Sequence, residues 1–452
     1  MIRVRYIPTD DGREIAFFPD SRELFYVDEK AKRIIEDLSA GKERDYILQN
    51  YRISPTEFDE EFAPITQPFA FAPHPLANKG KVHNKLALHL ANGCNLRCIY
   101  CYANGGVYHS SQDLMTREVL DRTVDVFYRE YDHINNFMLF GGEPLLNMDM
   151  IDYACEKIQQ IERSRGNRTT FGTVTNGTLI NRRFVELVKK HNIDVTVSYD
   201  GDPVINDRTR VFPDGSPTSK IIFDKIQMLR EVDGQPNGIQ AAYTQYHADA
   251  GITPFDMARN LKEQFPGVAL QIVPAVGGEG CPYVPKDLSG FPAAVAGFLN
   301  GLLENPDTIP PSFLAVEDTI DCLKDSKPYK RSKLCEACSG TLAVSTKGDI
   351  YPCYVLMDHK DIRLGSVFED DVFHTDHYRE TLRKFMQHNC KANQEECKDC
   401  CYDSICTHCM GQDEQLTGKL FGHASQICQM QRAMFDEGIK GLAKLYEKNN
   451  AE

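Results

Sequence analysis

Apolar and polar positions follow two periods along the middle of the chain. Between about residue 84 and residue 280, amphipathic stretches such as TREVLDRTVDVFYREY (116–131) separate short apolar runs. The apolar runs are KLALHLA (85–91), NNFMLF (135–140), TFGTVT (170–175), IDVTVSYD (193–200), IQAAYTQY (239–246) and VALQIVPA (268–275). Short apolar runs predict buried strands, and the longer amphipathic stretches predict helices. Strand and helix alternating over roughly 200 residues predict an α/β fold with a parallel sheet, here a partial (β/α)6 barrel.

The regions on either side have different patterns. Residues 1–80 begin with three short alternating runs, and two helical patterns follow: IRVRYI, EIAFF and ELFYV, then DEKAKRIIEDLSAG and SPTEFDEEF. The segment APITQPFAFAPHPLANKGK is typical of a linker. We therefore predict a small α+β domain at 1–80, a barrel at 81–285, bridging helices at 286–332, and a cysteine-rich domain with a C-terminal helix at 333–452.

Composition excludes several classes of protein. The 452 residues, 42% of them hydrophobic, predict two or three globular domains. No apolar run reaches the roughly 18 to 20 residues that span a bilayer, and the start MIRVRYIPTDDGRE lacks the apolar core of a signal peptide. The formal net charge of -14 argues against a nucleic-acid surface. We expect a cytoplasmic protein that does not bind membranes or nucleic acids.

Sixteen cysteines are unevenly distributed along the chain. Three lie at 94–101 and ten between Cys335 and Cys428, and the others are Cys155, Cys281 and Cys322. In a reducing compartment, thiols bind metal or take part in redox chemistry more often than they form disulfides. The clustering favours metal ligation.

The first cluster is ANGCNLRCIYCYANGG, in which Cys94, Cys98 and Cys101 are spaced C-x3-C-x2-C directly after the first barrel strand. Chemistry gathers at the carboxyl ends of such strands. Three thiolates can hold a [4Fe-4S] cluster and leave one iron with a free coordination position. A zinc site usually needs four ligands, but no fourth cysteine lies nearby and His89 lies inside the strand.

This loop resembles the radical S-adenosylmethionine (SAM) family. The resemblance implies that SAM binds the free iron and is cleaved to methionine and a 5'-deoxyadenosyl radical. It also implies a series of SAM contacts at the following strand ends. They are Tyr100 at the adenine, Gly141, Gly142 and Glu143 at the amino group, and Thr175, Asn176, Ser198, Asp200, Arg208 and Arg210 at the ribose and carboxylate. Either arginine could bind the carboxylate, and Asn206 replaces the family's usual histidine.

The later cysteines resemble the SPASM domain of radical SAM peptide maturases. Their spacing is C-x9-G-x4-C from Cys338 to Cys353, then C-x2-C-x5-C-x2-C from Cys397 to Cys409, then Cys428; the family has three residues before its sixth cysteine. The resemblance implies two auxiliary [4Fe-4S] clusters. One would be held by Cys338, Cys353, Cys409 and Cys335, and the other by Cys397, Cys400, Cys406 and Cys428. Without Cys335 the first cluster keeps an open position. Cys401 is expected to be a spare, and CxxC pairs alone would also fit a zinc ribbon.

The N-terminal pattern resembles the winged-helix-like leader-recognition domain of pathways that modify ribosomally made peptides, where a leader adds a strand to a sheet. A capping domain without a ligand is the alternative.

We therefore expect a radical SAM enzyme that crosslinks a precursor peptide, with SAM and three [4Fe-4S] clusters as cofactors and flavodoxin or ferredoxin as electron donor. A thioether is the preferred product, and a carbon-carbon bond is possible. The alternatives are an anaerobic sulfatase-maturing enzyme, which makes formylglycine, and an iron-sulfur electron carrier without enzymatic activity.

Overall fold

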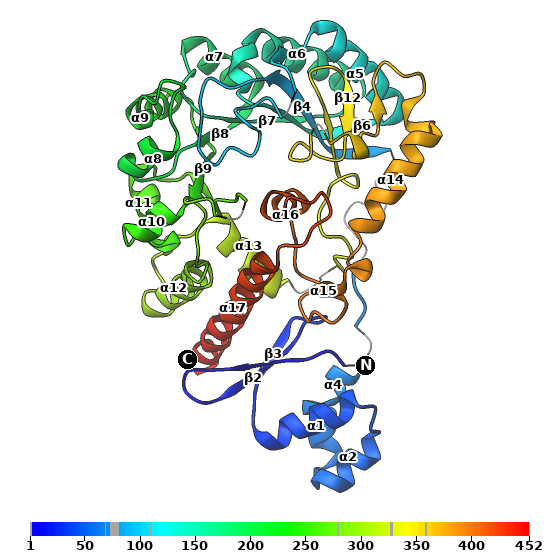
Figure 1. The fold of residues 1–452 in the computed structure, drawn as a ribbon. Helices are drawn as coiled ribbons and strands as arrows, with labels where there is room; N and C mark the ends of the chain where they lie inside the picture. The colour runs from blue at the N-terminus through cyan, green and yellow to red at the C-terminus, as the bar shows by residue number, and fades with distance from the viewer. Residues whose placement is uncertain are drawn as a thin grey trace.

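Six parallel strands form the centre of the fold, as the alternating pattern predicts (Figure 1). The computed structural model describes residues 2–67, 69–72, 81–108, 110–278, 280–325, 329–357 and 359–451. The strands, in their order across the sheet, are β10 (Ala269–Pro274), β9 (Gly238–Tyr243), β8 (Ile193–Ser198), β7 (Thr170–Thr175), β6 (His133–Gly141) and β4 (Val82–Asn92). Every pair of neighbours is parallel, so the carboxyl ends of all six strands meet at one end of the sheet.

Helices cover the outer side of this sheet (Figure 1). They are α5 (Arg117–Glu130), α6 (Met148–Ser164), α7 (Arg182–His191), α8 (Pro203–Thr209), α9 (Ser219–Leu229), α10 (Gln245–Asp249) and α11 (Pro254–Gln264), with a 3-10 turn at Pro144–Asn147. Alternate strand residues such as Val197, Ile239 and Leu270 are buried in the main core. The intervening residues face the inner side, where the register aligns Ser198 with Gln240 and Gln240 with Gln271. The inner face therefore carries a polar row across three strands.

The cysteine-rich region continues the same sheet. Its first strand lies parallel to β4, and two short antiparallel strands follow: β11 (Thr341–Val344), β12 (Asp349–Tyr351) and β13 (Gly365–Ser366). On the barrel side, β5 (Asp113–Leu114) pairs with β4. The remaining helices are α12 (Gly290–Glu304), α13 (Leu314–Lys324), α14 (Asp376–His388), α15 (Glu395–Lys398), α16 (Met410–Thr417) and α17 (Ser425–Ala451), with 3-10 turns at Lys360–Ile362, Val372–His374 and Lys391–Asn393. The expected bridging and C-terminal helices are present, and the domain bounds stay a prediction.

The N-terminal residues form a three-stranded antiparallel sheet with its own helices. The elements are β1 (Arg5–Pro8), β2 (Glu14–Phe18), β3 (Glu23–Val27), α1 (Glu29–Ser39), α2 (Arg44–Tyr51), α3 (Pro55–Glu61) and α4 (Ala63–Thr66). One face, with Ala16 and Phe18, packs on these helices. The other face carries Phe17, whose ring centroid lies 6.1 Å from that of Tyr402 in the cysteine-rich region. The sheet is thus buried on both sides. Much of the expected linker, at 68 and 73–80, lies outside the described residues.

Helix α17 depends on glycine for its close approach to α12. A Cβ added to Gly441 would lie 2.7 Å from the Leu299 Cβ, whereas one added to Gly297 would lie 3.4 Å from the nearest Phe255 atom. We expect Gly441→Ala to destabilise the protein by about 1–3 kcal/mol through overpacking. Gly297→Ala is the matched control and should be neutral or stabilising, because alanine favours helix. Anaerobic thermal unfolding followed by circular dichroism measures both, and equal midpoints would contradict this account of the interface.

Candidate active site and cysteine clusters

The first three predicted ligands lie in the loop that follows β4. The loop is fixed to the end of α8 and the segment that follows, because the Arg97 and Ile99 amides donate to the carbonyls of Val211 and Thr209 at 2.8 and 2.9 Å. Burial raises the pKa of the Cys94 thiol to about 12, and Glu143 adds to this effect. A buried thiolate therefore needs a cation beside it, which fits a metal-binding loop.

Glycines bring the end of β6 against this loop. A Cβ on Gly142 would lie 2.3 Å from the Gly93 carbonyl oxygen and 2.6 Å from the Gly106 Cα, and one on Gly141 would lie 2.4 Å from the Ala91 oxygen. Side chains at these positions would therefore push the two strand ends apart. The close approach places Glu143 near Cys94.

Glu143 is fully buried and is held by three donors. Its Oε1 accepts from the Leu145 amide at 3.0 Å and the Thr175 hydroxyl at 2.8 Å, and its Oε2 accepts from the Asn176 amide at 2.8 Å. Burial raises the pKa of Glu143, and these donors oppose that rise. The structure therefore places Thr175 and Asn176 around the Glu143 carboxylate. Asn95, which sequence reasoning missed, accepts through its Oδ1 from the side-chain Nδ2 of Asn176 at 2.9 Å.

A second polar cluster forms around Asp200 at the end of β8. Asp200 Oδ2 accepts from the Tyr100 hydroxyl at 2.6 Å and the Thr209 hydroxyl at 2.8 Å. Arg210 donates to the Tyr100 oxygen at 3.0 Å. The Arg210 side chain is buried, and its Nε has no hydrogen-bond partner within the described part of the chain. This guanidinium also lowers the pKa of Cys98, against the larger upward effect of burial.

The two candidate arginines have different surroundings. Arg208 is exposed, and its guanidinium carbon lies 3.5 Å from the centre of the Tyr246 ring. Arg210 instead faces the thiol loop, so the structure favours Arg210 as the group for an anionic ligand. Asn206, in the place of the family histidine, is buried and accepts from the Asp200 amide at 3.3 Å. Thr209 was missed, although it lies between the two arginines in the sequence.

The four thiols of the first auxiliary set lie near one another. Cys335 and Cys338 share one segment, and Cys353 and Cys409 come from two others, yet these thiols act on one another electrostatically. Burial raises the pKa of Cys353 to about 12, and the negative charge of the Cys409 thiolate is the second largest cause of this rise. Asn389 fixes the segment around Cys335, because its Oδ1 accepts from the Cys335 amide at 3.0 Å and its Nδ2 donates to the Cys335 carbonyl at 2.9 Å. Cys335 therefore lies with the other three thiols.

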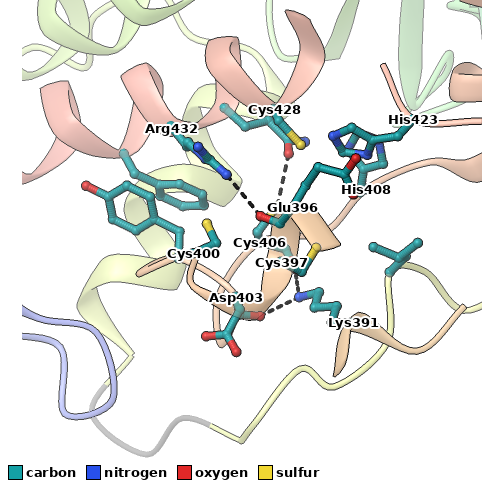
Figure 2. A pocket seen from close by; sticks show the side chains of 14 residues that line it. Lys391, Glu396, Cys397, Cys400, Asp403, Cys406, His408, His423, Cys428 and Arg432 are labelled. Carbon is teal, nitrogen blue, oxygen red and sulfur yellow. Dashed lines mark hydrogen bonds between the residues drawn. The ribbon is translucent and has the colours of Figure 1, made fainter. Parts of the chain in front are cut away.

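The second auxiliary set lines one pocket, shown in Figure 2. The lining includes Cys397, Cys400, Cys406, Cys428, Lys391, His408, His423 and Arg432. Burial raises the pKa of Cys406 to about 12, whereas the adjacent Cys401 thiol lowers that of Cys400 to about 6. The buried Lys391 ammonium donates to the carbonyls of Asp403 and Cys406, each at 2.5 Å. Cys401 is not part of this lining, and its role as a spare stays a prediction.

The N-terminal sheet contacts the loop that carries this second set. The Arg3 side chain donates to the carbonyls of Cys400 and Cys401 at 2.9 and 3.3 Å. Arg5 pairs with Asp436 of α17 at 2.8 Å. The N-terminal strands are therefore joined directly to the second thiol set and to α17.

Comparison with known proteins agrees with this geometry. Residues 88–237 match the Radical SAM superfamily, and residues 335–401 match SPASM, an iron-sulfur cluster-binding domain. A cysteine-type anaerobic sulfatase-maturating enzyme of Clostridium novyi (strain NT) is 23% identical over 366 residues, covering 78% of this chain and 94% of that enzyme. The radical SAM cyclopropyl synthase TigE of Paramaledivibacter caminithermalis is 23% identical over 289 residues, covering 61% of this chain and 58% of TigE.

Two solved structures share the fold. Native anSMEcpe with bound AdoMet has a TM-score of 0.61 at 20% identity, covering 80% of this chain and 99% of that chain. Streptococcus suis SuiB bound to S-adenosylmethionine has a TM-score of 0.53 at 14% identity, covering 95% of this chain and 98% of SuiB. The chain is an enzyme that contains a radical SAM domain and a SPASM iron-sulfur domain, which sets aside the non-enzymatic electron carrier. Among the described residues, no helix has both the length and the apolar character needed to cross a membrane.

The thiol sets predict the metal content. Three [4Fe-4S] clusters would give about twelve irons per chain after anaerobic reconstitution. Changing Cys94, Cys98 and Cys101 together to Ala should remove about four irons and abolish SAM cleavage. The control Cys322→Ala lies outside every set and should change neither quantity. Full iron content in the triple variant, measured by elemental analysis, would show that this loop is not a cluster site.

The surroundings of the two arginines predict a difference in SAM binding. Arg210→Met should weaken binding about tenfold to hundredfold, since a hydrogen bond between charged groups contributes roughly 1.5–3 kcal/mol. Arg208→Met removes a surface cation and should have little effect. Equilibrium dialysis with labelled SAM measures both dissociation constants. A larger loss in the Arg208 variant would reverse the assignment.

Proposed function

We propose that the protein installs a crosslink in a ribosomally synthesised precursor peptide, using a radical derived from SAM. The observation that carries the proposal is the N-terminal sheet, which is fixed to the Cys400 loop and has a free edge. Within the described part of the chain, β3 pairs with β2 alone. A peptide leader could add a strand to this edge, where backbone hydrogen bonds supply affinity and side-chain pockets supply selectivity.

In this proposal, Cys94, Cys98 and Cys101 hold the cluster that binds SAM. Glu143 accepts from the SAM ammonium group, and Arg210 binds its carboxylate. When bound, the cluster supplies the electron that converts SAM to methionine and the 5'-deoxyadenosyl radical. The chain orients SAM through the Asp200 and Glu143 clusters and keeps water away by burying both carboxylates. We assign Ser198 no particular contact with SAM; it lies on the inner face of the sheet, beside Gln240.

Two structural relatives support a peptide substrate. They are native anSMEcpe with bound AdoMet and Cp18Cys peptide, and SuiB bound to precursor peptide SuiA. The SuiB likeness covers 94–95% of this chain in its two higher-scoring structures, compared with 80–82% for anSMEcpe. The longer coverage favours the precursor-peptide proposal. A flavodoxin or ferredoxin is the proposed electron donor, and the cytoplasm is the proposed compartment.

The bond type is proposed on chemical grounds. A thioether between a cysteine sulfur and a carbon is preferred, because an auxiliary cluster with an open position can bind a substrate thiolate. However, Cys335 lies with the other three thiols of the first set, and this weakens the reason for preferring sulfur. A carbon-carbon crosslink would use the same residues. Either product has lost two hydrogen atoms.

Mass spectrometry after anaerobic incubation with SAM, reductant and the precursor encoded beside the gene tests this function. We expect a peptide lighter by two hydrogen atoms. A thioether consumes a thiol that iodoacetamide would otherwise alkylate, whereas a carbon-carbon bond leaves it reactive. An unmodified precursor, together with 5'-deoxyadenosine formation, would contradict the proposal.

Sulfatase maturation is the second candidate. It is favoured by the Clostridium novyi relative, which aligns along 94% of its length. In that reaction a cysteine or serine of a sulfatase is oxidised to formylglycine. Incubation with a sulfatase-derived peptide, followed by an aldehyde-specific probe, distinguishes the two activities.

The free edge of β3 predicts the effect of a surface substitution. Phe25 of β3 is 48% exposed, and Tyr46, which lies outside the sheet in α2, is 42% exposed. If Phe25 anchors the leader, Phe25→Ala should weaken binding of a fluorescent precursor about tenfold or more in an anisotropy titration. Tyr46→Ala should bind normally, and both variants should keep their iron and SAM cleavage. Equal affinities would remove β3 as the receiving strand.

A further inference from the structure

The pocket of the second thiol set also contains two imidazole rings that the cysteine assignment does not use. His408 and His423 line this pocket beside Cys428 (Figure 2). One ring nitrogen of each histidine and the Cys428 sulfur all lie within 4.8 Å of one another. The two rings are stacked with centroids 5.6 Å apart. Two nitrogens and one sulfur therefore converge at one point of the pocket.

His408 is oriented as a ligand would be. The ring is buried, and its Nε2 lies 2.7 and 2.6 Å from the two carboxylate oxygens of Asp413. With the Nε2 proton donated to this carboxylate, Nδ1 carries a lone pair. This Nδ1 is buried and has no hydrogen-bond partner among the residues that the structure describes. A metal-binding histidine typically donates its other ring proton to a carboxylate in this way.

Asp413 also fixes the segment that carries the second imidazole. Its Oδ1 accepts from the amide of Ala424, the residue after His423, at 2.9 Å. Asp413 itself is 2% exposed, so water does not compete for these contacts. One buried carboxylate therefore positions both histidines next to the first turn of α17, where Cys428 lies.

The spacing of the three donors suits one ion. Zinc binds imidazole nitrogen at about 2.0–2.1 Å and thiolate at about 2.3 Å, so donors on a tetrahedral zinc lie roughly 3.3–3.8 Å apart. Small side-chain movements would bring the three atoms to that spacing. Donors on different corners of an iron-sulfur cube bind separate irons and lie farther apart. A mixed nitrogen and sulfur set is also the donor set that zinc prefers.

We propose that His408, His423 and Cys428 form a binding site for a single divalent ion of the zinc class. Because a Cys428 thiolate held in this site is not free for a cluster, the ion and the second auxiliary cluster compete for it. The competition, though not the ion site, rests on the proposed role of Cys428 as a cluster ligand. Zinc would then occupy the site when the cluster is missing.

Metal analysis of the full-length protein tests this site. The variant Cys397→Ala/Cys400→Ala retains the three proposed zinc ligands but lacks two thiols of the second cluster. After anaerobic purification with zinc and dialysis against a weak chelator, we expect about one zinc per chain. Adding His408→Gln should remove the zinc, whereas adding His374→Gln, a half-exposed histidine paired with Glu130, should leave it. The absence of zinc in the double variant, or its retention with His408→Gln, would overturn the proposal.

Two further measurements keep the test decisive. Iron retained at the other two thiol sets reports that the variants are folded. If the variant with His408→Gln loses that iron as well, His423→Gln replaces it in the test, because His423 is only half buried. The zinc content of the variant with His423→Gln then decides the outcome. In the wild-type protein, zinc content should fall as iron reconstitution of the second set rises. A chain that holds one zinc together with all three clusters would overturn the competition, and this outcome is independent of whether the peptide is crosslinked.

Discussion

The cost of burying thiolate charge is the constraint on which this structure depends. Burial raises the pKa of thiols in all three sets, as at Cys94, Cys353 and Cys406. Like-charged thiolates packed together are stable only beside a cation, so the folded arrangement and metal binding require each other. The sets also join segments that are distant in sequence, such as Cys338 with Cys409. Metal binding is therefore expected to stabilise the C-terminal third of the fold as well as to serve its chemistry.

The N-terminal sheet is not a separate unit, because its residues contact the loop that carries the second thiol set. Arg3 binds carbonyls of the Cys400 loop, and Phe17 packs against Tyr402 of the same loop. Arg3 and Phe17 therefore connect the sheet that contains β3 directly to the loop of the second thiol set. Removing the whole sheet would expose this apolar surface, so point substitutions at the free edge test its function more cleanly than a truncation.

Sequence reasoning was most successful where periodicity and spacing carry the information. The six barrel strands follow from alternation, whereas the division of the later cysteines into two sets was implied by the resemblance to the SPASM domain. Helix α2 was missed because its apolar residues form no clear stripe in RDYILQNY. The choice between Arg208 and Arg210 also could not be made from sequence, because it depends on which side chain turns toward Cys98. Likewise, only the folded chain shows Thr175 and Asn176 around Glu143 and two histidines beside Cys428.

The two auxiliary sets differ in charge although both consist of cysteines. At the first set, the strongest electrostatic effects on Cys353 come from other thiols. At the second, Lys391 acts on Cys406 and Arg432 acts on Cys400 and Cys428. Nearby cations stabilise added negative charge, most strongly where water is excluded. A cluster held by the second set would therefore have its negative charge partly balanced by Lys391 and Arg432, whereas the thiols of the first set have mainly one another as charged neighbours.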